Sequence, residues 1–275
     1  MSQTVSLNAY QYEDLLVRSN DLYAAAKYQI LLRHLEGERE LSILNAGCGS
    51  GELSFLLAAA GHRVLGVDPA PDYIELARLN SDRAGIDNCS FLVSSIEEFD
   101  CDEVFDCVVA TDVLEHIEDD RGAFVKLVRL VKPGGILLIT VPAGPWLYGF
   151  HDESLGHYRR YSRRQLTRLV SPLCRIEALR YFGFSLIPVC YLYSKLLCKP
   201  YPVGASGDAV NNPALAFTLR SLLRLDRLLP LPLGTSLILR ATRPLSTDVE
   251  APLRRQWQGG RVAERFDRHL VSDAS

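Results

Sequence analysis

The sequence predicts an α/β protein with a Rossmann-like, doubly wound, mostly parallel seven-stranded sheet and helices on both faces. Short apolar runs rich in β-branched residues alternate with amphipathic stretches from residue 41 onward, the pattern of a parallel sheet covered by helices. A glycine-rich turn follows the first run, where nucleotide-binding sheets place their ligand. Of the 275 residues, 48% are hydrophobic and 23% charged, which excludes fibrous and largely disordered classes.

The expected elements follow in order along the chain. Strands are expected at 41–46, 63–67, 89–93, 104–111, 136–141, 175–182 and 234–241. Helices are expected at 52–60, 71–84, 119–131 and 163–171, with an irregular loop over 143–163. Because crossovers between parallel strands are right-handed, successive helices should cover both faces.

Three further parts complete the predicted organisation. Residues 1–40 should form an N-terminal helical cover whose tyrosines, at 10, 12, 23 and 28, either lie over the cofactor or belong to the core. Residues 41–243 should form one domain that contains a helical insertion over 185–230, before the last strand. Residues 244–275 contain no apolar run and are predicted to be a flexible tail.

Charge and cysteine usage limit the cellular setting. The net charge is −3, and although residues 1–174 are rich in acids and 175–243 in bases, no overall field favours nucleic acid. Seven cysteines without C-x-x-C spacing, and a start without a basic and apolar leader, predict a cytoplasmic protein. The longest apolar stretch, 182–198, is interrupted by Pro188 and Lys195 and is too short for a spanning helix, which needs roughly 20 residues.

The glycine turn at 45–51 (N-A-G-C-G-S-G) is either a simple strand-to-helix connection or a ligand cradle. A dinucleotide fingerprint would require a third glycine at position 52, where this chain has Glu52. That carboxylate would repel a pyrophosphate, so a cationic ligand without phosphates, such as S-adenosylmethionine, fits better. Asp68 ends the second strand and could accept hydrogen bonds from a ribose, or cap the following helix.

Four segments resemble the successive motifs of class I S-adenosylmethionine-dependent methyltransferases. They are 45–51, 66–69 (G-V-D-P), 105–117 (F-D-C-V-V-A-T-D-V-L-E-H-I) and 130–142 (L-V-K-P-G-G-I-L-L-I-T-V-P). The resemblance covers about 40–183 and resumes at the last strand. Within the family, Leu114-Glu115-His116 and the segment 157–161 (H-Y-R-R-Y) are similar to small-molecule O-methyltransferases of the ubiquinone-pathway kind.

The resemblance implies S-adenosylmethionine as cofactor and a set of residues that bind it. These are Asn45, Gly47, Cys48, Gly49, Gly51, Asp68, Pro69, Ser95, Ile96 and Thr111. Two positions depart from the family pattern, since Asn45 replaces the usual acid at the head of the glycine motif and Ser95 replaces an acid that often contacts adenine.

Two histidines in the segment after the fifth strand are candidate bases. His157, and less so His151, could take a proton from an oxygen nucleophile, because a neutral imidazole accepts protons near neutral pH. The alternative for both is a hydrogen bond that anchors the loop. Asp112, Glu115 and His116 could together hold a divalent cation, but we expect Asp112 to be an N-cap, His116 to pack beneath the cofactor, and no metal to bind.

Basic and apolar residues later in the chain leave the acceptor open. An arginine cluster is either a solvated helix face or a receptor for an anionic group of the substrate: Arg159, Arg160, Arg163, Arg164 and Arg168. The insertion could be a lid, which we favour, a membrane-contacting patch over 184–233, or a homodimer interface. A lid of this composition predicts an amphiphilic substrate. Nucleic acid is not expected, because the arginine cluster is short and the catalytic half of the chain is acidic.

We therefore expect a methyltransferase that transfers the methyl group of S-adenosylmethionine to a small molecule by in-line displacement, at an oxygen atom. Phenol, carboxylate, amine and carbon acceptors all stay open. The alternatives are a nicotinamide-dependent oxidoreductase, against which Glu52 argues, and a catalytically silent protein that keeps the fold to bind a partner.

Overall fold

A computed structural model describes residues 21–101, 104–199 and 213–245 of the chain. Its centre is a seven-stranded sheet in the order β3-β2-β1-β4-β5-β7-β6. The strands are β1 (Ser42–Ala46), β2 (Arg63–Asp68), β3 (Cys89–Val93), β4 (Phe105–Thr111), β5 (Val131–Pro142), β6 (Arg175–Phe182) and β7 (Ser236–Thr242). The first five pair in parallel, and β7 runs antiparallel between β5 and β6. The predicted doubly wound, mostly parallel seven-stranded sheet is confirmed.

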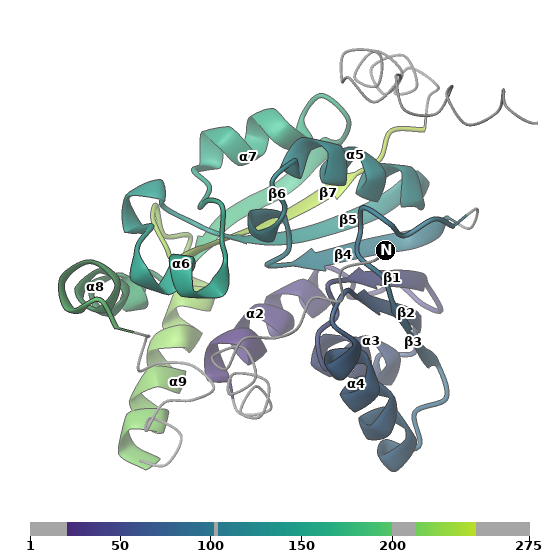
Figure 1. Ribbon diagram of the computed structural model, residues 1–275, viewed down its shortest axis with the longest axis horizontal. Coiled ribbons are helices and arrows are strands. Elements are labelled where there is room, and N and C mark those ends of the chain that lie inside the picture. Colours follow the sequence, from purple (N-terminus) through teal and green to yellow (C-terminus); the bar gives the residue numbers. More distant parts are fainter. Residues whose placement is uncertain (1–20, 102–103, 200–212, 246–275) are drawn as a thin grey trace, which may run out of the picture.

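Helices cover both faces of this sheet (Figure 1). On one face lie α5 (Asp120–Leu130) and α7 (Arg163–Val170). On the other lie α2 (Leu22–Arg33), α3 (Glu52–Ala59), α4 (Pro71–Ala84) and α9 (Pro213–Leu228). The short helices are η2 (Leu114–His116), η3 (Pro145–Leu147), α6 (Phe150–Leu155), η4 (Phe184–Leu186), α8 (Ile187–Tyr191) and η5 (Leu192–Leu197).

Alternation along the central strands divides the core into two halves. Val108 and Ala110 of β4 face the α5 side, whereas Cys107 and Val109 face the α3 side. Each strand buries both faces because successive side chains point in opposite directions. This explains why the strands read as unbroken apolar runs rather than as alternating ones.

The segment after β5 is more ordered than the sequence predicted. Residues 143–163 were expected to be irregular, but they contain η3, α6 and a bridge between Ala143 and Tyr161. Glycines bound α6: Gly149 precedes it, and Gly156 ends it in the left-handed region, at φ 74°. A six-residue helix is too short to show helical periodicity, so the expectation of an irregular loop was wrong.

The insertion between β6 and β7 is helical, as predicted, and comprises η4, α8, η5 and α9. Among the described residues, no helix combines the length and apolarity needed to cross a bilayer. Within the predicted N-terminal cover the described residues form α2, which packs against α9. Its place over a cofactor stays a prediction. Tyr23 is stacked on Phe182 with 5.2 Å between ring centroids, as a core residue would be. Tyr10, Tyr12, most of the C-terminal tail and the centre of the insertion lie outside the described residues.

Candidate functional site

The predicted site residues gather at the carboxyl edge of the parallel strands, where sheets of this kind bind ligands. The glycine turn follows β1, Asp68 ends β2, and Thr111 ends β4. The segment 143–161, which carries both candidate histidines, follows β5 at the same edge.

The glycine turn needs glycine for two reasons. Gly47, Gly49 and Gly51 adopt φ values of 68°, 54° and 94°, in the left-handed region that disfavours other residues. A Cβ on Gly47 would also lie 2.4 Å from Val113 Cγ2, in the loop after β4. The turn is therefore fixed by close approach as well as by backbone conformation.

Four N–H groups of this turn already donate to other atoms of the protein. Gly47 and Cys48 both donate to the Val67 carbonyl, at 2.8 and 3.0 Å. Gly49 donates to Asp68 Oδ2 at 2.9 Å, and Gly51 donates to the Cys48 carbonyl at 3.1 Å. A pyrophosphate relies on such N–H groups. Their use here argues against a dinucleotide and leaves the turn as a wall for a ligand without phosphates.

Asp68 is buried and supports the turn on both sides. Its Oδ2 accepts from Gly49, and its Oδ1 accepts from the N–H of Ala70 at 3.0 Å. It does not cap the following helix, because Ala70 is the residue before α4 and no side chain caps that end. Asp68 stands at the end of β2, where nucleoside-binding sheets place the carboxylate that accepts from ribose hydroxyls.

Two buried polar atoms at this edge have no hydrogen-bond partner among the described residues: Asn45 Oδ1 and Thr111 Oγ1. The other end of the Asn45 amide is satisfied, because Nδ2 donates to Ser54 Oγ at 2.9 Å. A buried unsatisfied polar atom costs about 1–3 kcal/mol, and in a native fold it calls for a ligand or a water molecule. Both atoms belong to residues that the sequence predicted to bind the cofactor.

The other predicted cofactor residues with informative side chains are Cys48, Pro69, Ser95 and Ile96. The Cys48 side chain packs with Ile74, Ala77 and Phe91 in a small apolar cluster, and burial raises the pKa of its thiol. Ile96 is buried in the core on the α5 face. Pro69 is exposed, and Ser95 Oγ accepts from the N–H of Glu98 at 3.1 Å. Contacts between these residues and a cofactor stay predictions.

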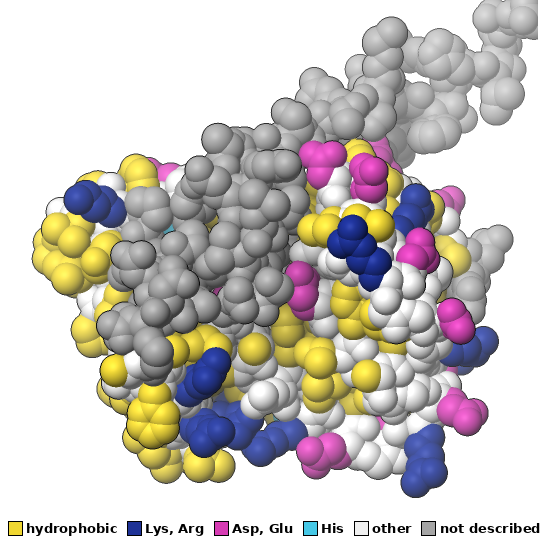
Figure 2. Space-filling view, turned by 90° about the horizontal axis from the view of Figure 1, so that it is seen from below, with side chains coloured by type: hydrophobic (Ala, Val, Ile, Leu, Met, Phe, Trp, Pro, Cys, Tyr) yellow, Lys and Arg dark blue, Asp and Glu magenta, His cyan; other side chains and the backbone are white. Residues whose placement is uncertain are grey.

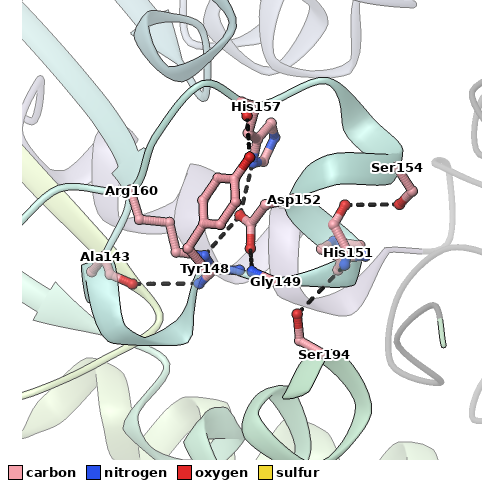
Figure 3. Close-up of polar contacts among 9 residues, drawn as sticks. All are labelled: Ala143, Tyr148, Gly149, His151, Asp152, Ser154, His157, Arg160 and Ser194. Atoms are coloured by element: carbon pink, nitrogen blue, oxygen red, sulfur yellow. Dashed lines mark hydrogen bonds and ion pairs between the residues drawn. The ribbon is translucent and has the colours of Figure 1, made fainter. Parts of the chain in front are cut away.

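His157 belongs to a buried network that joins α6 to the segment after it (Figure 3). Its Nδ1 lies 2.9 Å from Asp152 Oδ1, and Arg160 Nε donates to the same oxygen at 2.7 Å. The other Asp152 oxygen accepts from the Gly149 N–H at 3.1 Å. Tyr148 donates from its hydroxyl to the His157 carbonyl at 2.9 Å. Asp152, which lies within α6, was not predicted from the sequence, although it precedes His157 by only five residues.

The charges in this network fix the histidine tautomer. Burial alone would raise the pKa of Asp152, but the hydrogen bond from His157 and the charge of Arg160 outweigh it and hold that pKa below its ordinary value. Asp152 is therefore an ionised carboxylate that accepts a proton-bearing Nδ1. In the neutral ring the lone pair then lies on Nε2, where a base needs it.

His151 lies on α6 and is partly exposed. Its N–H donates to Ser194 Oγ of η5 at 3.4 Å, and its carbonyl accepts from Ser154 at 2.8 Å (Figure 3). The backbone of His151 thus ties α6 to the insertion. Its role as a base stays a prediction.

Asp112 differs from its predicted role as an N-cap. It follows β4 in the left-handed region, at φ 53°, and caps no helix. Its carboxylate forms an ion pair with Lys27 and accepts from Thr140 Oγ1 at 2.9 Å. Burial alone would lower the pKa of Lys27, but the negative charge of Asp112 outweighs burial and holds this pKa above its ordinary value. Lys27 was not predicted as a site residue, and its one sequence signal is a lysine within the apolar stretch of α2.

A possible cation site lies beside the candidate base. Glu115, His116 and His157 each offer one ligand atom, and these atoms lie within 4.8 Å of one another. Glu115 is fully buried, and neither of its carboxylate oxygens has a hydrogen-bond partner among the described residues. Burial and the nearby charge of Asp112 raise its pKa well above the ordinary value. A divalent cation here would require Glu115 in its ionised form and would occupy the same Nε2 of His157 that a base needs, with His157 in the place predicted for Asp112.

The five arginines of the predicted basic cluster separate in the structure. Arg160 is buried against Asp152, and Arg159 forms an ion pair with Asp120 at 3.0 Å. The remaining three lie exposed on α7: Arg163, Arg164 and Arg168. The α7 arginines have the placement of a solvated helix face.

The sequence is similar to those of known methyltransferases. Residues 38–168 match the family model described as a methyltransferase domain. The ubiquinone biosynthesis O-methyltransferase of Methylocella silvestris is 31% identical over 172 residues, which cover 58% of this chain and 66% of the relative. That of Azorhizobium caulinodans is 40% identical over 111 residues, covering 40% of this chain and 42% of the relative. The chain thus spans less than two thirds of either relative.

Solved structures share the fold at low identity. N-methyltransferase NodS from Bradyrhizobium japonicum, in complex with S-adenosyl-L-homocysteine, has a TM-score of 0.57 at 18% identity, covering 86% of this chain and 93% of that one. Geranyl diphosphate C-methyltransferase from Streptomyces coelicolor has a TM-score of 0.57 at 15% identity, covering 80% and 79%. At such identities the likeness concerns the fold alone.

Proposed function

Since the chain belongs to the class I S-adenosylmethionine-dependent methyltransferases, we propose that it transfers a methyl group from S-adenosylmethionine to an oxygen atom of a small molecule. The single observation that carries the proposal is the glycine turn, in which four N–H groups are occupied within the protein and Asp68 is the neighbouring carboxylate. Such a wall suits a cationic nucleoside and disfavours a diphosphate. The names of the curated relatives support oxygen as the acceptor atom.

The residues present fit this cofactor. Asp68 would hold the ribose, and the turn at 47–51 would lie against the rest of the nucleoside. The orphaned Asn45 Oδ1 and Thr111 Oγ1 would gain a partner. When bound, S-adenosylmethionine supplies a methyl group on a positively charged sulfur, ready for direct displacement. The protein's main task is then to align the nucleophile with the methyl–sulfur axis.

His157 is the proposed general base. With its Nδ1 proton held by Asp152, Nε2 can take the proton of an acceptor hydroxyl. The ionised Asp152 then stabilises the imidazolium, and Arg160 keeps Asp152 in position. General-base catalysis of this kind contributes about 10²–10⁴-fold in rate.

The proposed acceptor is amphiphilic. Trp146 and Phe150, which lie within the segment 143–161 that carries both histidines, are exposed. Apolar side chains at the mouth of a site favour a substrate with an apolar portion. All seven cysteines are free, which fits a reducing compartment, and we propose the cytoplasm.

Isothermal titration calorimetry with S-adenosylhomocysteine tests cofactor binding. The wild-type chain should bind saturably, and Asp68→Ala should weaken binding by about tenfold or more, because two ribose hydrogen bonds are lost. Asp72→Ala is the matched control, since Asp72 is exposed in the first turn of α4. Absence of binding at millimolar ligand would contradict the proposal.

Incubation with methyl-labelled S-adenosylmethionine and a metabolite extract, followed by mass spectrometry, tests the reaction itself. A labelled product with the methyl group on oxygen supports the proposal. Label on nitrogen or carbon would contradict the choice of acceptor atom. If no labelled product forms although the cofactor binds tightly, the chain is a catalytically silent binding protein.

A further inference from the structure

Helix α9 presents two apolar faces rather than one. Its inner face, Ala216, Leu219 and Leu223, is buried against the sheet and α2. On the opposite side, Phe217, Leu225 and Leu228 are 72%, 52% and 68% exposed. A surface helix ordinarily carries polar residues on that side. The outer apolar face therefore has no role in the described core.

A basic stripe lies between these two faces. Arg220, Arg224 and Arg227 recur at helical spacing along α9, and the first two are exposed. Two exposed lysines, Lys195 and Lys199, lie in or just after η5.

Acids are nearly absent from this region. Within 184–199 and 213–233 the one acid is Asp226, which is buried and accepts from both the N–H and the hydroxyl of Ser185. The exposed charge of these ranges is entirely positive, and it complements an anionic surface.

The short helices extend the exposed apolar surface. Tyr191, Leu192 and Leu196 of α8 and η5 are all exposed, with Leu196 at 65%. The Tyr191 ring lies 6.3 Å from that of Trp146, in the segment that leads to the candidate base. Figure 2 shows hydrophobic and basic side chains together on the side of the molecule that carries α8 and α9, with acidic ones mainly on the other side.

We propose that α8, η5 and α9 form a docking surface for a lipid bilayer that contains anionic lipids. Exposed leucines and aromatic rings would enter the boundary between headgroups and acyl chains, while the basic stripe meets the headgroups. No helix of the described residues can span the bilayer, so the contact is peripheral. A second copy of the chain is a poorer occupant, because a symmetric contact would bring the two basic stripes together.

Co-sedimentation of the full chain with vesicles tests this proposal without any methyl acceptor. Vesicles of phosphatidylcholine with 30% phosphatidylglycerol should bind the chain about 100-fold more tightly than phosphatidylcholine alone, since each basic residue near an anionic surface adds several-fold. Raising the salt from about 0.05 to 0.5 M should weaken this binding strongly. Equal binding to both vesicles, or none, would overturn the proposal.

Paired variants separate the docking surface from charge in general. Arg220→Glu with Arg224→Glu should lower binding to the anionic vesicles by about tenfold or more. The matched control is Arg164→Glu with Arg168→Glu, two exposed arginines with the same spacing on α7. A similar loss in the control would mean that total charge, not this surface, binds the vesicle.

A second pair tests the apolar face. Phe217→Gln with Leu228→Gln should weaken binding by about tenfold or more, because two exposed apolar side chains no longer enter the membrane. Leu56→Gln with Leu79→Gln, on α3 and α4, is the control, as these leucines are 41% and 43% exposed. Sedimentation velocity without lipid provides the remaining outcome: a dimer that the Phe217 and Leu228 pair abolishes, with no vesicle binding, would assign the face to a second copy.

Discussion

The glycine turn after β1 and the segment 143–161 after β5 lie at the same edge of the sheet, but different forces hold them. Backbone hydrogen bonds and close approach fix the turn, through Gly47, Val67 and Val113. The segment after β5 is fixed by buried charges, with Asp152 between His157 and Arg160. The turn provides a rigid wall, whereas the segment positions a group that must exchange a proton. Substitutions in the two regions should therefore fail in different ways.

The largest effect is expected at the buried carboxylate. Asp152→Asn should lower kcat by about 10²–10⁴-fold, because the amide can donate to Nδ1 and so move the imidazole proton to Nε2, where a base cannot use it. The dissociation constant for S-adenosylhomocysteine should stay unchanged. Glu153→Gln, an exposed neighbour on α6, is the matched control. An unchanged kcat for Asp152→Asn would exclude His157 as the base.

The same carboxylate gives the wild-type chain a pH dependence. A group whose pKa is lowered by folding stabilises the fold above its ordinary value and loses that contribution as the pH falls. Lowering the pH below about 4 should therefore reduce the unfolding temperature of the wild-type chain more than that of Asp152→Asn. Parallel pH profiles for the two proteins would contradict the ionised state of Asp152.

The next effect is expected at the glycine turn. In Gly47→Ala the new Cβ would overlap Val113, and the positive φ would be strained, so cofactor affinity should fall by about 100-fold. Gly61→Ala is the control, because Gly61 has a φ of +93° but nothing within 4 Å of an added Cβ. The Gly61→Ala variant has the strained positive φ but no overlap of the new Cβ with a neighbouring side chain. Calorimetry should find equal cofactor affinities for Gly61→Ala and the wild type.

A smaller effect of opposite sign is expected at Glu115. Its raised pKa means that ionisation of the unfolded chain opposes folding as the pH rises above the ordinary value of 4.5. Glu115→Gln should therefore unfold at a temperature about 2–4 °C higher than the wild type at pH 7, with the gain vanishing near pH 4. If addition of Mg²⁺ or Zn²⁺ stabilises the wild type but not this variant, Glu115 is a cation ligand. A destabilised variant at pH 7 would contradict the buried, unpaired carboxyl.

The smallest effect is expected at Thr111. Thr111→Val removes an orphaned hydroxyl and keeps the shape, so the chain should gain slight stability without cofactor and lose about fivefold in cofactor affinity. Thr140→Val, its partner across β4 and β5, removes a hydrogen bond to Asp112 and should lose stability. Unchanged cofactor affinity in Thr111→Val would place that hydroxyl outside the site.

The sequence predicted the turn better than the segment after β5. Strand β1, its glycines and Asp68 are neighbours in one short motif, and their positions follow from local rules of backbone conformation. The network around Asp152 depends on a six-residue helix and on contacts that only the fold creates. For the same reason the ion pair between Lys27 and Asp112, separated by 85 residues, could not be read from local pattern.

The outer face of α9 shows a second limit of pattern reading. The spacing of arginines beside leucines predicted an amphipathic helix, but periodicity alone does not tell which apolar stripe faces the core. Only the structure separates Leu219 and Leu223, which are buried, from Phe217 and Leu228, which are not.

A crystal grown with equal concentrations of S-adenosylhomocysteine and NADH would show directly which ligand the glycine turn accepts. We expect S-adenosylhomocysteine at the end of β1 and β2, with its ribose hydroxyls bonded to Asp68 and no density for the dinucleotide. Density for NADH, with its diphosphate against the turn beside Glu52, would contradict it.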